Sequence, residues 1–494
     1  MDREETLSFV PPDSYSDLDS SFTSSTTSAS TFSARSSLSL ASSSSSFAPK
    51  PLPHNCSDPH WSALRAAANV SPDGLLHLHH LRLLRPLGSG HLARVFHCRL
   101  HGFADDHSSS EFALKVIDLD ALSRSSSDYS KTDDDECEEE NGDGRGKMWH
   151  VRAEARALAE MDHPFLPTLY ARIDASHYAC FLIDYCPGGD LHLLLRRCRG
   201  HRLPPVAARF YAAEVLLALE YLHALGFVYR DLKPENVLLR NDGHIMLSDF
   251  DLSFRSHVTP VLRPRRRNRL FCCLLGCSVS SEDEEPEFVA EPSSALSRAC
   301  VGTHEYLAPE VVNGRGHGNG VDWWAFGVFL YELFYGRTPF KGTTKETTLR
   351  NILTREVKFP ETNRGNGSET KARDLISRLL VKDPARRMGS ARGAAEIKLH
   401  PFFENVQWQL IRCTRPPVVT GPAGSARVRA AKVKRAQWWS GWRKSAGIHS
   451  NSRSNNNKTK GLKPGFGLGL LQSKKGTKER NELGCCSWKP FVQR

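Results

Sequence analysis

The sequence predicts an α+β fold, because it combines short apolar runs typical of strands, a hairpin turn and long stretches with helical periodicity. Phe112–Ile117 is a short apolar run of strand type, interrupted only by Lys115. Pro205–Leu225 repeats apolar residues at helical spacing and therefore predicts a buried helix. Its expected buried stripe consists of Val206, Phe210, Ala213 and Leu217.

The remaining elements follow in chain order. Met148–Met161 contains good helix formers and few breakers, so we expect a helix there. Val237–Leu239 and His244–Leu247 flank an Asp-Gly turn and predict a β-hairpin. Val321–Tyr335 is a strongly apolar helix, and no internal repeat is visible.

Composition narrows the class of protein. With 494 residues, 39% of them hydrophobic, the chain can bury a sizeable core. No apolar run approaches the roughly 18 residues that a membrane span needs, and the start lacks the layout of a signal peptide. The 13 Cys are scattered without metal-ligand spacing, which favours reduced thiols in the cytosol or nucleus.

Low-complexity ends enclose the patterned part of the chain. Eighteen of the first 50 residues are Ser, so we expect a disordered Ser-rich region over residues 1–75. Folded patterning begins near Leu81 and stops near Phe403. The tail 404–494 holds 19 Lys and Arg against three acidic residues, so the excess of the net charge of +11 belongs to it.

Two polar stretches inside the patterned part predict surface insertions. The first covers about 121–147 and has seven acids within Asp133–Glu140. The second covers about 255–298, where a basic run is followed by an apolar, Cys-containing segment and then by an acidic run.

A glycine-rich turn follows the first apolar strand. Gly88, Ser89 and Gly90 precede Val95, and glycines let backbone N–H groups approach phosphate oxygens closely. The turn therefore indicates nucleotide binding, although a glycine-rich turn that binds no phosphate has the same pattern.

Lys115 is a cation within an apolar strand. Burying its ammonium is costly unless the ammonium finds a partner. Glu154, on the helix that follows, is the candidate partner. The alternative is a lysine that extends its ammonium into water.

Four residues have the groups that phosphoryl transfer requires. Asp231 supplies a carboxylate that orients a hydroxyl and accepts its proton, and Lys233 a cation for the developing charge. Asn236 and Asp249 supply the oxygen ligands that Mg²⁺ prefers. The sequence therefore predicts transfer of a phosphoryl group with magnesium.

These segments resemble a known family. Tyr229–Asn236 and Asp249–Asp251 are similar to the catalytic and magnesium-binding loops of protein kinases. Residues 81–403 resemble a serine/threonine kinase of the AGC group, with Tyr229 as a typical feature. The Asp-Phe-Asp triplet and the long insertion before Gly302 resemble the plant-specific branch of that group.

Further segments refine the resemblance. Asp162–Tyr170 and Tyr185–Leu191 are similar to the PINOID and WAG members of that branch, and Asp17–Thr23 looks most like WAG. The resemblance implies the bilobal protein kinase fold, with a β-rich N-lobe at 81–183 and a larger helical C-lobe at 187–403.

The resemblance also implies the cofactors and several roles. ATP and Mg²⁺ would lie in the cleft, with a hinge at Asp184–Cys186 and Asp190 near the ribose. Structural roles fall to Asp322, which would brace the catalytic loop, and to an ion pair of Glu310 with Arg387.

The implied substrates are proteins. The resemblance implies phosphorylation of Ser in the cytoplasmic loop of PIN auxin-efflux carriers, and so control of polar auxin transport. Glu235 and Glu332 match positions that bind arginine before the acceptor, which predicts a basophilic preference. Thr303, at the end of the activation segment, belongs to the same expected substrate site.

Several positions depart from the family pattern. Ala93 replaces a third glycine, and Asp251 replaces a glycine that lets the metal loop flip. Ala299 stands where relatives carry the activating Ser/Thr, so Ser297 is the nearest substitute for pairing with Arg230. These departures leave a pseudokinase scaffold as the alternative function. The last residues keep at most half of the hydrophobic Phe-x-x-Phe dock of AGC kinases.

Location is expected to be cytoplasmic with peripheral plasma-membrane association. Arg263–Arg269 beside Cys272, Cys273 and Cys277 combines a basic patch with sites for acylation. In the tail, Arg427–Arg435 precedes three tryptophans and suits a membrane interface. The alternatives are nuclear import, a solvated tail, and nucleic-acid binding by the tail. We expect a monomer without a specific nucleic-acid partner.

Overall fold

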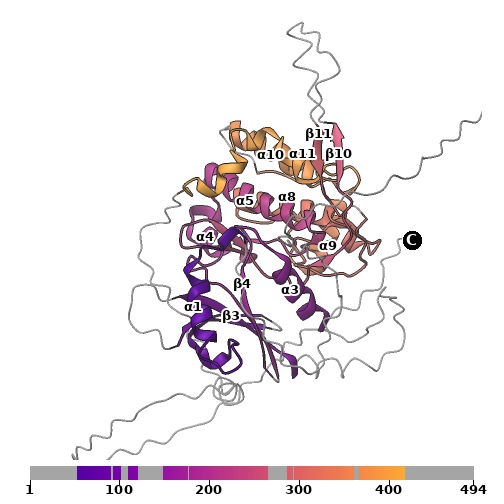
Figure 1. Ribbon diagram of the computed structural model, residues 1–494. Coiled ribbons are helices and arrows are strands. Elements are labelled where there is room, and N and C mark those ends of the chain that lie inside the picture. The colour runs from indigo at the N-terminus through magenta and orange to yellow at the C-terminus, as the bar shows by residue number, and fades with distance from the viewer. Residues whose placement is uncertain are drawn as a thin grey trace, which may run out of the picture. The chain divides into compact units, whose positions relative to one another are not determined.

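The computed structural model describes residues 53–90, 93–101, 110–120, 148–175, 177–264, 286–292, 294–360 and 367–417. The acidic insertion, the basic run and cysteines of the second insertion from residue 265 on, and the basic tail after residue 417 lie outside these residues. Figure 1 shows the described elements, with a sheet and the helices α1 and α3 in the first half of the chain and most helices in the second.

A five-stranded antiparallel sheet forms the first half of the fold. Its order is β1-β2-β3-β5-β4. The strands are β1 (Leu81–Ser89), β2 (Ala93–Leu100), β3 (Glu111–Asp118), β4 (Leu169–Ala175) and β5 (Tyr178–Asp184). The strand predicted from the apolar run around Lys115 is confirmed as β3.

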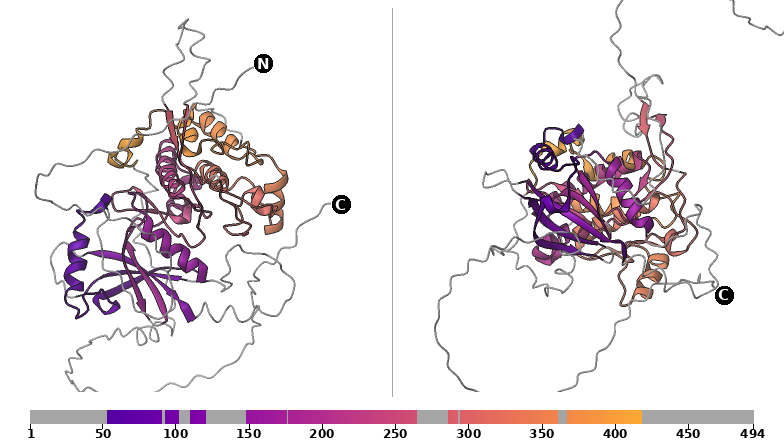
Figure 2. Two further views of the ribbon diagram at one scale, coloured as in Figure 1. Left: turned by 45° about the vertical axis from the view of Figure 1, so that its right-hand side comes forward. Right: turned by 60° about the horizontal axis from the view of Figure 1, so that its bottom comes forward.

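Helices cover both faces of this sheet (Figure 2). Alternate residues of a strand point to opposite faces. Phe112 and Leu114 accordingly pack with Trp61 of α1 (Pro59–Ala68), whereas Ile117 belongs to the cluster of α3 (Met148–Glu160). The helix predicted at Met148–Met161 is confirmed, and it reaches the face of the sheet that carries Lys115.

The helix α1 corrects the expected disorder of residues 1–75. Trp61 and Leu64 are buried at helical spacing, and Asp58 caps the helix by accepting from the His60 amide at 2.9 Å. The Ser-rich composition ends before this segment, so enough apolar surface is present to fold it against the sheet. A short 3-10 helix, η1 (Pro53–Asn55), precedes it, and η2 (Leu78–His80) leads into β1.

The second half of the fold is mostly helical. Its helices are α4 (Leu191–Arg197), α5 (Pro205–Ala224), α7 (Pro309–Val312), α8 (Gly320–Tyr335), α9 (Lys345–Thr354), α10 (Gly367–Leu379) and α11 (Gly393–Lys398). The helices predicted at α5 and α8 are confirmed. The stripe expected for α5 is wrong at Val206, which is 62% exposed, because buried residues such as Ala212 and Leu216 define the packed face.

Short strand pairs and turns carry the loops of the site. The predicted hairpin is confirmed as β7 (Val237–Leu239) with β8 (Ile245–Leu247). The other pairs are β6 (Phe227–Val228) with β9 (Phe254–Arg255), and β10 (Val261–Pro264) with β11 (Pro286–Val289). The 3-10 helices here are η3 (Arg199–His201), η4 (Pro234–Asn236), η5 (Pro401–Phe403) and η6 (Trp408–Cys413).

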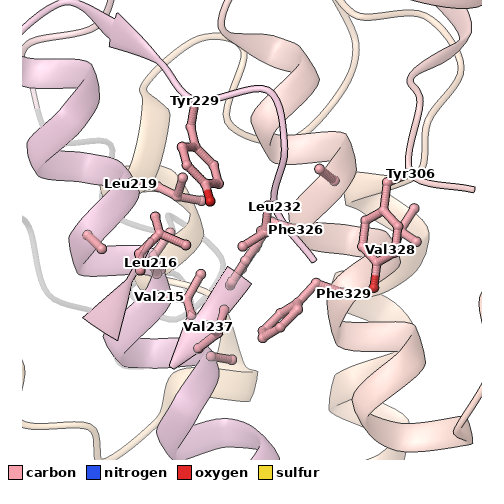
Figure 3. Packing of buried hydrophobic residues seen from close by; sticks show 14 of the residues in the cluster. Val215, Leu216, Leu219, Tyr229, Leu232, Val237, Tyr306, Phe326, Val328 and Phe329 are labelled. Atoms are coloured by element: carbon pink, nitrogen blue, oxygen red, sulfur yellow. The ribbon is translucent and has the colours of Figure 1, made fainter. Parts of the chain in front are cut away.

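The loop between β6 and β7 lies on a buried apolar base. Figure 3 shows Leu232 of this loop between side chains of α5 and α8, with Leu216 on one side and Phe326 on the other. Tyr229 and Leu232 are fully buried. Because packed interiors allow little displacement, this base fixes the loop that carries the predicted catalytic residues.

Packing continues beyond the limit that the pattern predicts. The sequence pattern predicts that the packed region ends near Phe403. Ile411, however, is 5% exposed, and Val406 and Trp408 pack against the same hydrophobic cluster. Among the described helices, none has the length and apolar character to cross a bilayer.

Candidate active site

Lys115, Glu154 and Asp249 meet at one point. The Lys115 Nζ donates to Glu154 Oε1 at 2.5 Å and to Asp249 Oδ1 at 2.8 Å. The predicted partner of Lys115 is therefore in place, and the alternative of an ammonium in water is wrong. Burial opposes the charge of Lys115, but the two carboxylates outweigh it and raise its pKa.

The glycine-rich turn joins β1 to β2. Gly88 pairs with Val95 across the two strands, and Val95 pairs in turn with Lys115 of β3. The Gly90 amide donates to the Ala93 carbonyl at 2.9 Å. The structure thus brings the predicted nucleotide-binding turn, with Ser89 as the last residue of β1, next to the strand that carries Lys115.

The two ends of the predicted hinge, Asp184 and Cys186, and the predicted ribose residue Asp190 have different environments. Asp184 accepts from the Thr168 amide at 2.7 Å and from Arg240 at 3.3 Å, so its carboxylate braces the end of β5. The Cys186 thiol lies 3.8 Å from a methionine sulfur, and burial raises its pKa to about 12. Asp190 caps α4 by accepting from the Leu193 amide at 2.6 Å.

Asp231 is the centre of the second cluster. Lys233 Nζ donates to its Oδ2 at 2.6 Å, and the Thr303 hydroxyl donates to its Oδ1 at 2.9 Å. Asn236 Nδ2 donates to the carbonyl and to Oδ2 of Asp231, both at 2.9 Å. Lys233 also donates to Thr303 at 2.9 Å. Three of these hydrogen bonds reach the carboxylate of Asp231 and set its orientation, and the side chain is buried, with Asp231 5% exposed.

Asp322 braces the backbone of this loop as predicted. Its oxygens accept from the amides of Tyr229 and Arg230, each at 2.8 Å. Arg230 has a φ of 68°, a left-handed conformation that is unfavourable for a side chain of its size. The two hydrogen bonds to a fully buried carboxylate hold the backbone in that conformation.

Asn236 and Asp249 have the chemistry of a magnesium site. Asp231 takes up the amide nitrogen of Asn236, which leaves the amide oxygen for a cation. Burial raises the pKa of Asp249, but Lys115 outweighs it and holds the carboxyl below its usual range. No cluster of three His, Cys, Asp or Glu able to hold a metal occurs in the described ranges. Two protein ligands fit Mg²⁺, which usually keeps waters and phosphate oxygens as its other ligands.

Asp251 lies beside these carboxylates. Burial and then Asp249 raise its pKa to about 6. Its carbonyl accepts from His150 of α3 at 2.9 Å. Non-glycine residues with positive φ in the described ranges include Asp249 at 64° but not Asp251. The third position of the triplet therefore needs no glycine for the conformation that it adopts.

Arg230 contacts the predicted regulatory residue. Its Nη1 donates to the Ser297 hydroxyl at 3.0 Å, and its Nε donates to the Leu252 carbonyl at 2.7 Å. The guanidinium also lies 4.6 Å from the centre of the Phe254 ring. Burial lowers the pKa of Arg230 to about 10. Ser297 thus already contacts Arg230 as an unmodified hydroxyl.

The predicted ion pair is bidentate. Arg387 Nη1 and Nη2 donate to the two oxygens of Glu310 at 2.7 and 2.8 Å. Arg387 is 1% exposed and also donates to the Gly320 and Val381 carbonyls. The pair therefore connects the end of the activation segment to α8 and to the chain before α11.

Glu235 and Glu332 lie close enough for their charges to interact. Glu332 accepts from the Tyr306 hydroxyl, and burial raises the pKa of Glu332, with Glu235 adding to the effect. His192 of α4 lies 3.2 Å from Glu235. Glu235 is half-exposed and so accessible to a cationic ligand.

Sequence reasoning missed two residues of this region. His223 at the end of α5 contacts both Glu291, which follows β11, and Asp322. His223 is a polar residue in a largely apolar helix, which indicates a buried partner. Nothing in the local sequence identifies Glu291 as the partner of His223, because the two residues lie 68 positions apart in the chain.

Comparison with known proteins agrees with this geometry. The family model for the protein kinase domain matches residues 81–265 and 282–403. The chain is 53% identical over 418 residues to the serine/threonine-protein kinase WAG1 of Arabidopsis thaliana, covering 81% of this chain and 82% of the relative. It is 52% identical to WAG2 of the same plant, covering 84% and 85%. Identity to protein kinase PINOID of Oryza sativa subsp. japonica is 46%, covering 76% of each chain. The chain therefore belongs to the protein kinase family, as a plant AGC-group serine/threonine kinase of the PINOID and WAG type.

Proposed function

We propose that this serine/threonine kinase transfers the γ-phosphate of ATP to Ser and Thr hydroxyls that follow arginine in protein substrates. The observation that carries the proposal is the cluster around Asp231. Its carboxylate is oriented by Lys233, Asn236 and Thr303, each within hydrogen-bond distance. Such a carboxylate orients an acceptor hydroxyl and takes its proton.

The remaining residues of the site act on the phosphates and the metal. Lys115, held by Glu154, supplies the cation for the nucleotide phosphates, and Lys233 the cation for the transferred group. Asn236 and Asp249 would hold Mg²⁺, which neutralises the charge on the phosphate oxygens when bound.

The proposed preference for arginine rests on charge. Glu235 and Glu332 present two carboxylates near the end of the activation segment, where Tyr306 and Thr303 lie. A guanidinium pairs with carboxylates in two parallel hydrogen bonds, which gives both energy and geometry. An arginine two or three residues before the acceptor is the proposed determinant.

The finer substrate assignment comes from the likeness to WAG and PINOID kinases. The proposed substrates are Ser residues in the cytoplasmic loop of PIN auxin-efflux carriers, which would give the enzyme a role in polar auxin transport.

Peripheral membrane association is a further part of the proposal. β10 and β11 bring the two ends of the second insertion together, and Leu262 pairs with Phe288 across them. Both side chains are largely exposed, at 69% and 63%. Apolar residues next to the basic run of the insertion suit an anionic membrane surface. In a fluorescent fusion, the arginines of Arg263–Arg269 are replaced by neutral residues and Cys272, Cys273 and Cys277 by serine. This fusion should leave the cell periphery, and unchanged localisation would contradict the proposal.

A peptide assay tests the preference. Ser peptides with arginine two or three residues upstream should be phosphorylated better than peptides with alanine or glutamate there. Glu235→Gln and Glu332→Gln should each raise KM for the arginine peptide by about tenfold, since each removes one charged partner. Glu404→Gln is the matched control, because Glu404 pairs only with exposed Lys371 among the described contacts. A preference for acidic or proline-directed peptides would contradict the proposal.

A further inference from the structure

The segment that returns from the second insertion, described at residues 291–292 and 294–297, is docked on the helical half of the fold at both ends. We call it the return segment. At its start, Glu291 Oε2 lies 2.7 Å from His223 Nδ1 and accepts from Asn319 at 2.7 Å. At its end, Ser297 forms an antiparallel bridge with His317, with N···O distances of 2.9 and 2.8 Å. Segments 68 residues apart in sequence are thus joined by directed contacts.

Three glycines make room for the return segment. A Cβ on Gly393, which has a φ of +57°, would lie 1.6 Å from Glu291 Oε1. A Cβ on Gly318 would lie 2.7 Å from the Ala295 carbonyl, and one on Gly316 would lie 2.8 Å from the Leu296 side chain. A side chain at Gly318 would displace the backbone of the segment, whereas one at Gly393 or Gly316 would displace the side chain of Glu291 or Leu296. The surface of the helical half is therefore shaped for this segment.

His223 connects the return segment to the catalytic loop. Its side chain is fully buried between two carboxylates, with Nδ1 facing Glu291 and Nε2 lying 2.9 Å from Asp322 Oδ2. The same Oδ2 accepts from the Tyr229 amide, and Oδ1 accepts from the Arg230 amide. Each ring nitrogen donates to a carboxylate only when the imidazole carries both protons.

We propose that Glu291 is a positioning residue for phosphoryl transfer, because it holds His223 as the cation that keeps Asp322 against the catalytic loop. The carboxylate of Glu291 contacts His223 and Asn319, so its effect on the catalytic loop passes through His223 and Asp322. The return segment then belongs to the catalytic machinery, and its displacement releases the brace on Tyr229 and Arg230.

The charges around His223 explain why Glu291 is needed. In the part of the chain that the structure describes, Glu291 and Asp322 are the charged groups that act on His223, and Trp323 covers it with its ring edge. Burial disfavours the imidazolium, but the two carboxylates outweigh it and raise the pKa of His223 to about 10. Removal of one carboxylate should therefore bring deprotonation of His223 into the range of ordinary assays.

The test uses the full-length enzyme with Glu291→Gln, which keeps size and hydrogen-bonding capacity but removes the charge. We expect kcat on a basic Ser peptide to fall by about tenfold at pH 7.5, with KM for ATP and peptide within about twofold. The pH profile should also change. The wild-type kcat should stay level as pH rises towards 9, whereas the kcat of the variant should fall as His223 loses its proton. Glu291→Asp, which keeps the charge, should restore most of the level profile.

Two further variants separate positioning from stability. Gly318→Ala should displace the return segment without removing a charge and should lower kcat, because its Cβ would lie 2.7 Å from the Ala295 carbonyl. Glu404→Gln is the exposed control and should leave kcat unchanged. Thermal unfolding of each variant identifies the folded fraction, and rates are taken per folded molecule.

The outcomes are distinct. If Glu291→Gln lowers the unfolding temperature but leaves kcat and its pH profile unchanged, the residue is merely structural and the proposal fails. The inference rests on kinase activity towards basic peptides. A wild-type enzyme without activity on the peptide would contradict the proposed function itself, whereas an active wild type with an unaffected Glu291→Gln would contradict only this inference.

Discussion

At the scale of single residues, Asp251 shows how a departure from a family pattern leaves the chemistry intact. Its carboxylate is next to Asp249, yet Lys115 contacts Asp249 and not Asp251. The backbone at Asp251 does not have the positive φ for which glycine is suited. The metal ligand and the third residue of the triplet therefore have separate roles.

Replacing Asp251 by glycine tests this separation. Asp251→Gly should keep kcat within about threefold of the wild type, because no predicted contact to phosphate or metal is lost. The free energy of unfolding should fall by about 0.5–1 kcal/mol, since glycine adds freedom to the unfolded chain. Steady-state kinetics and urea unfolding measure both. A loss of activity as large as that of Asp249→Ala would show that Asp251 takes part in the chemistry.

The buried pair of Glu310 and Arg387 gives a second prediction at this scale. Glu310→Gln should destabilise the fold by about 3–5 kcal/mol, because it leaves a buried guanidinium without its counter-ion. Replacing both residues by methionine should recover much of that loss, since no uncompensated charge remains. Urea unfolding checks both variants. If the single change costs no more than Glu404→Gln, the pair does not have this structural role.

At the scale of elements, α1 shows that the folded unit begins before the part that resembles a kinase. Tyr170 of β4 donates to Asp58 at 2.9 Å and lies 3.2 Å from Asp184 at the end of β5. The ring of Trp61 lies 4.9 Å from that of Tyr170. The helix thus covers the outer face of the sheet next to the predicted hinge.

Removing the anchor of α1 should therefore affect the whole sheet. Trp61→Ala should lower the free energy of unfolding by about 3–5 kcal/mol, since Trp61 is 1% exposed and leaves a cavity. Val70→Ala is the control, because Val70 is 81% exposed and should change stability by less than about 0.5 kcal/mol. Chemical unfolding followed by far-UV circular dichroism measures the stability of both variants. Equal stability of the two variants would mean that α1 is not part of the folded unit.

Elements with a strong local signal could be predicted from the sequence. α5, α8 and the β7–β8 hairpin follow from periodicity and an Asp-Gly turn, and Lys115 required a partner because its strand is apolar. The exposed Val206 was not predictable, because the face of a helix that is apolar nearly all round is chosen by its neighbours.

Contacts between distant segments could not be predicted in this way. Glu291 stands between Ala290 and Pro292 without a motif around it, and only the fold brings it to His223 and Asn319. α1 was missed because the Ser-rich start dominated the composition, although Trp61 and Leu64 have helical spacing. The residues of phosphoryl transfer could be predicted from the sequence, because their chemistry allows only a few residue types and these occur in a fixed order along the chain.

At the scale of the whole molecule, two clusters from different halves of the fold form one site. Lys115 and Glu154 come from the sheet and α3, whereas Asp231 and Asn236 come from the loop before β7. Asp249, after β8, contacts Lys115 and so joins the two clusters. An active kinase requires the catalytic residues of both halves. A pseudokinase scaffold would not require the contacts of Lys115, Asp231 and Asp249 to be complete.

Transfer of radiolabelled phosphate from ATP to a basic Ser peptide tests this account most directly. Wild type, Asp231→Asn and Asp249→Ala are compared at equal folded concentration, with Asp73→Asn on the exposed surface as the control. We predict incorporation by the wild type and the control, and a loss of at least about 100-fold in both active-site variants. Equal incorporation by wild type and Asp249→Ala, or none by the wild type, would contradict the assignment of catalysis to this site.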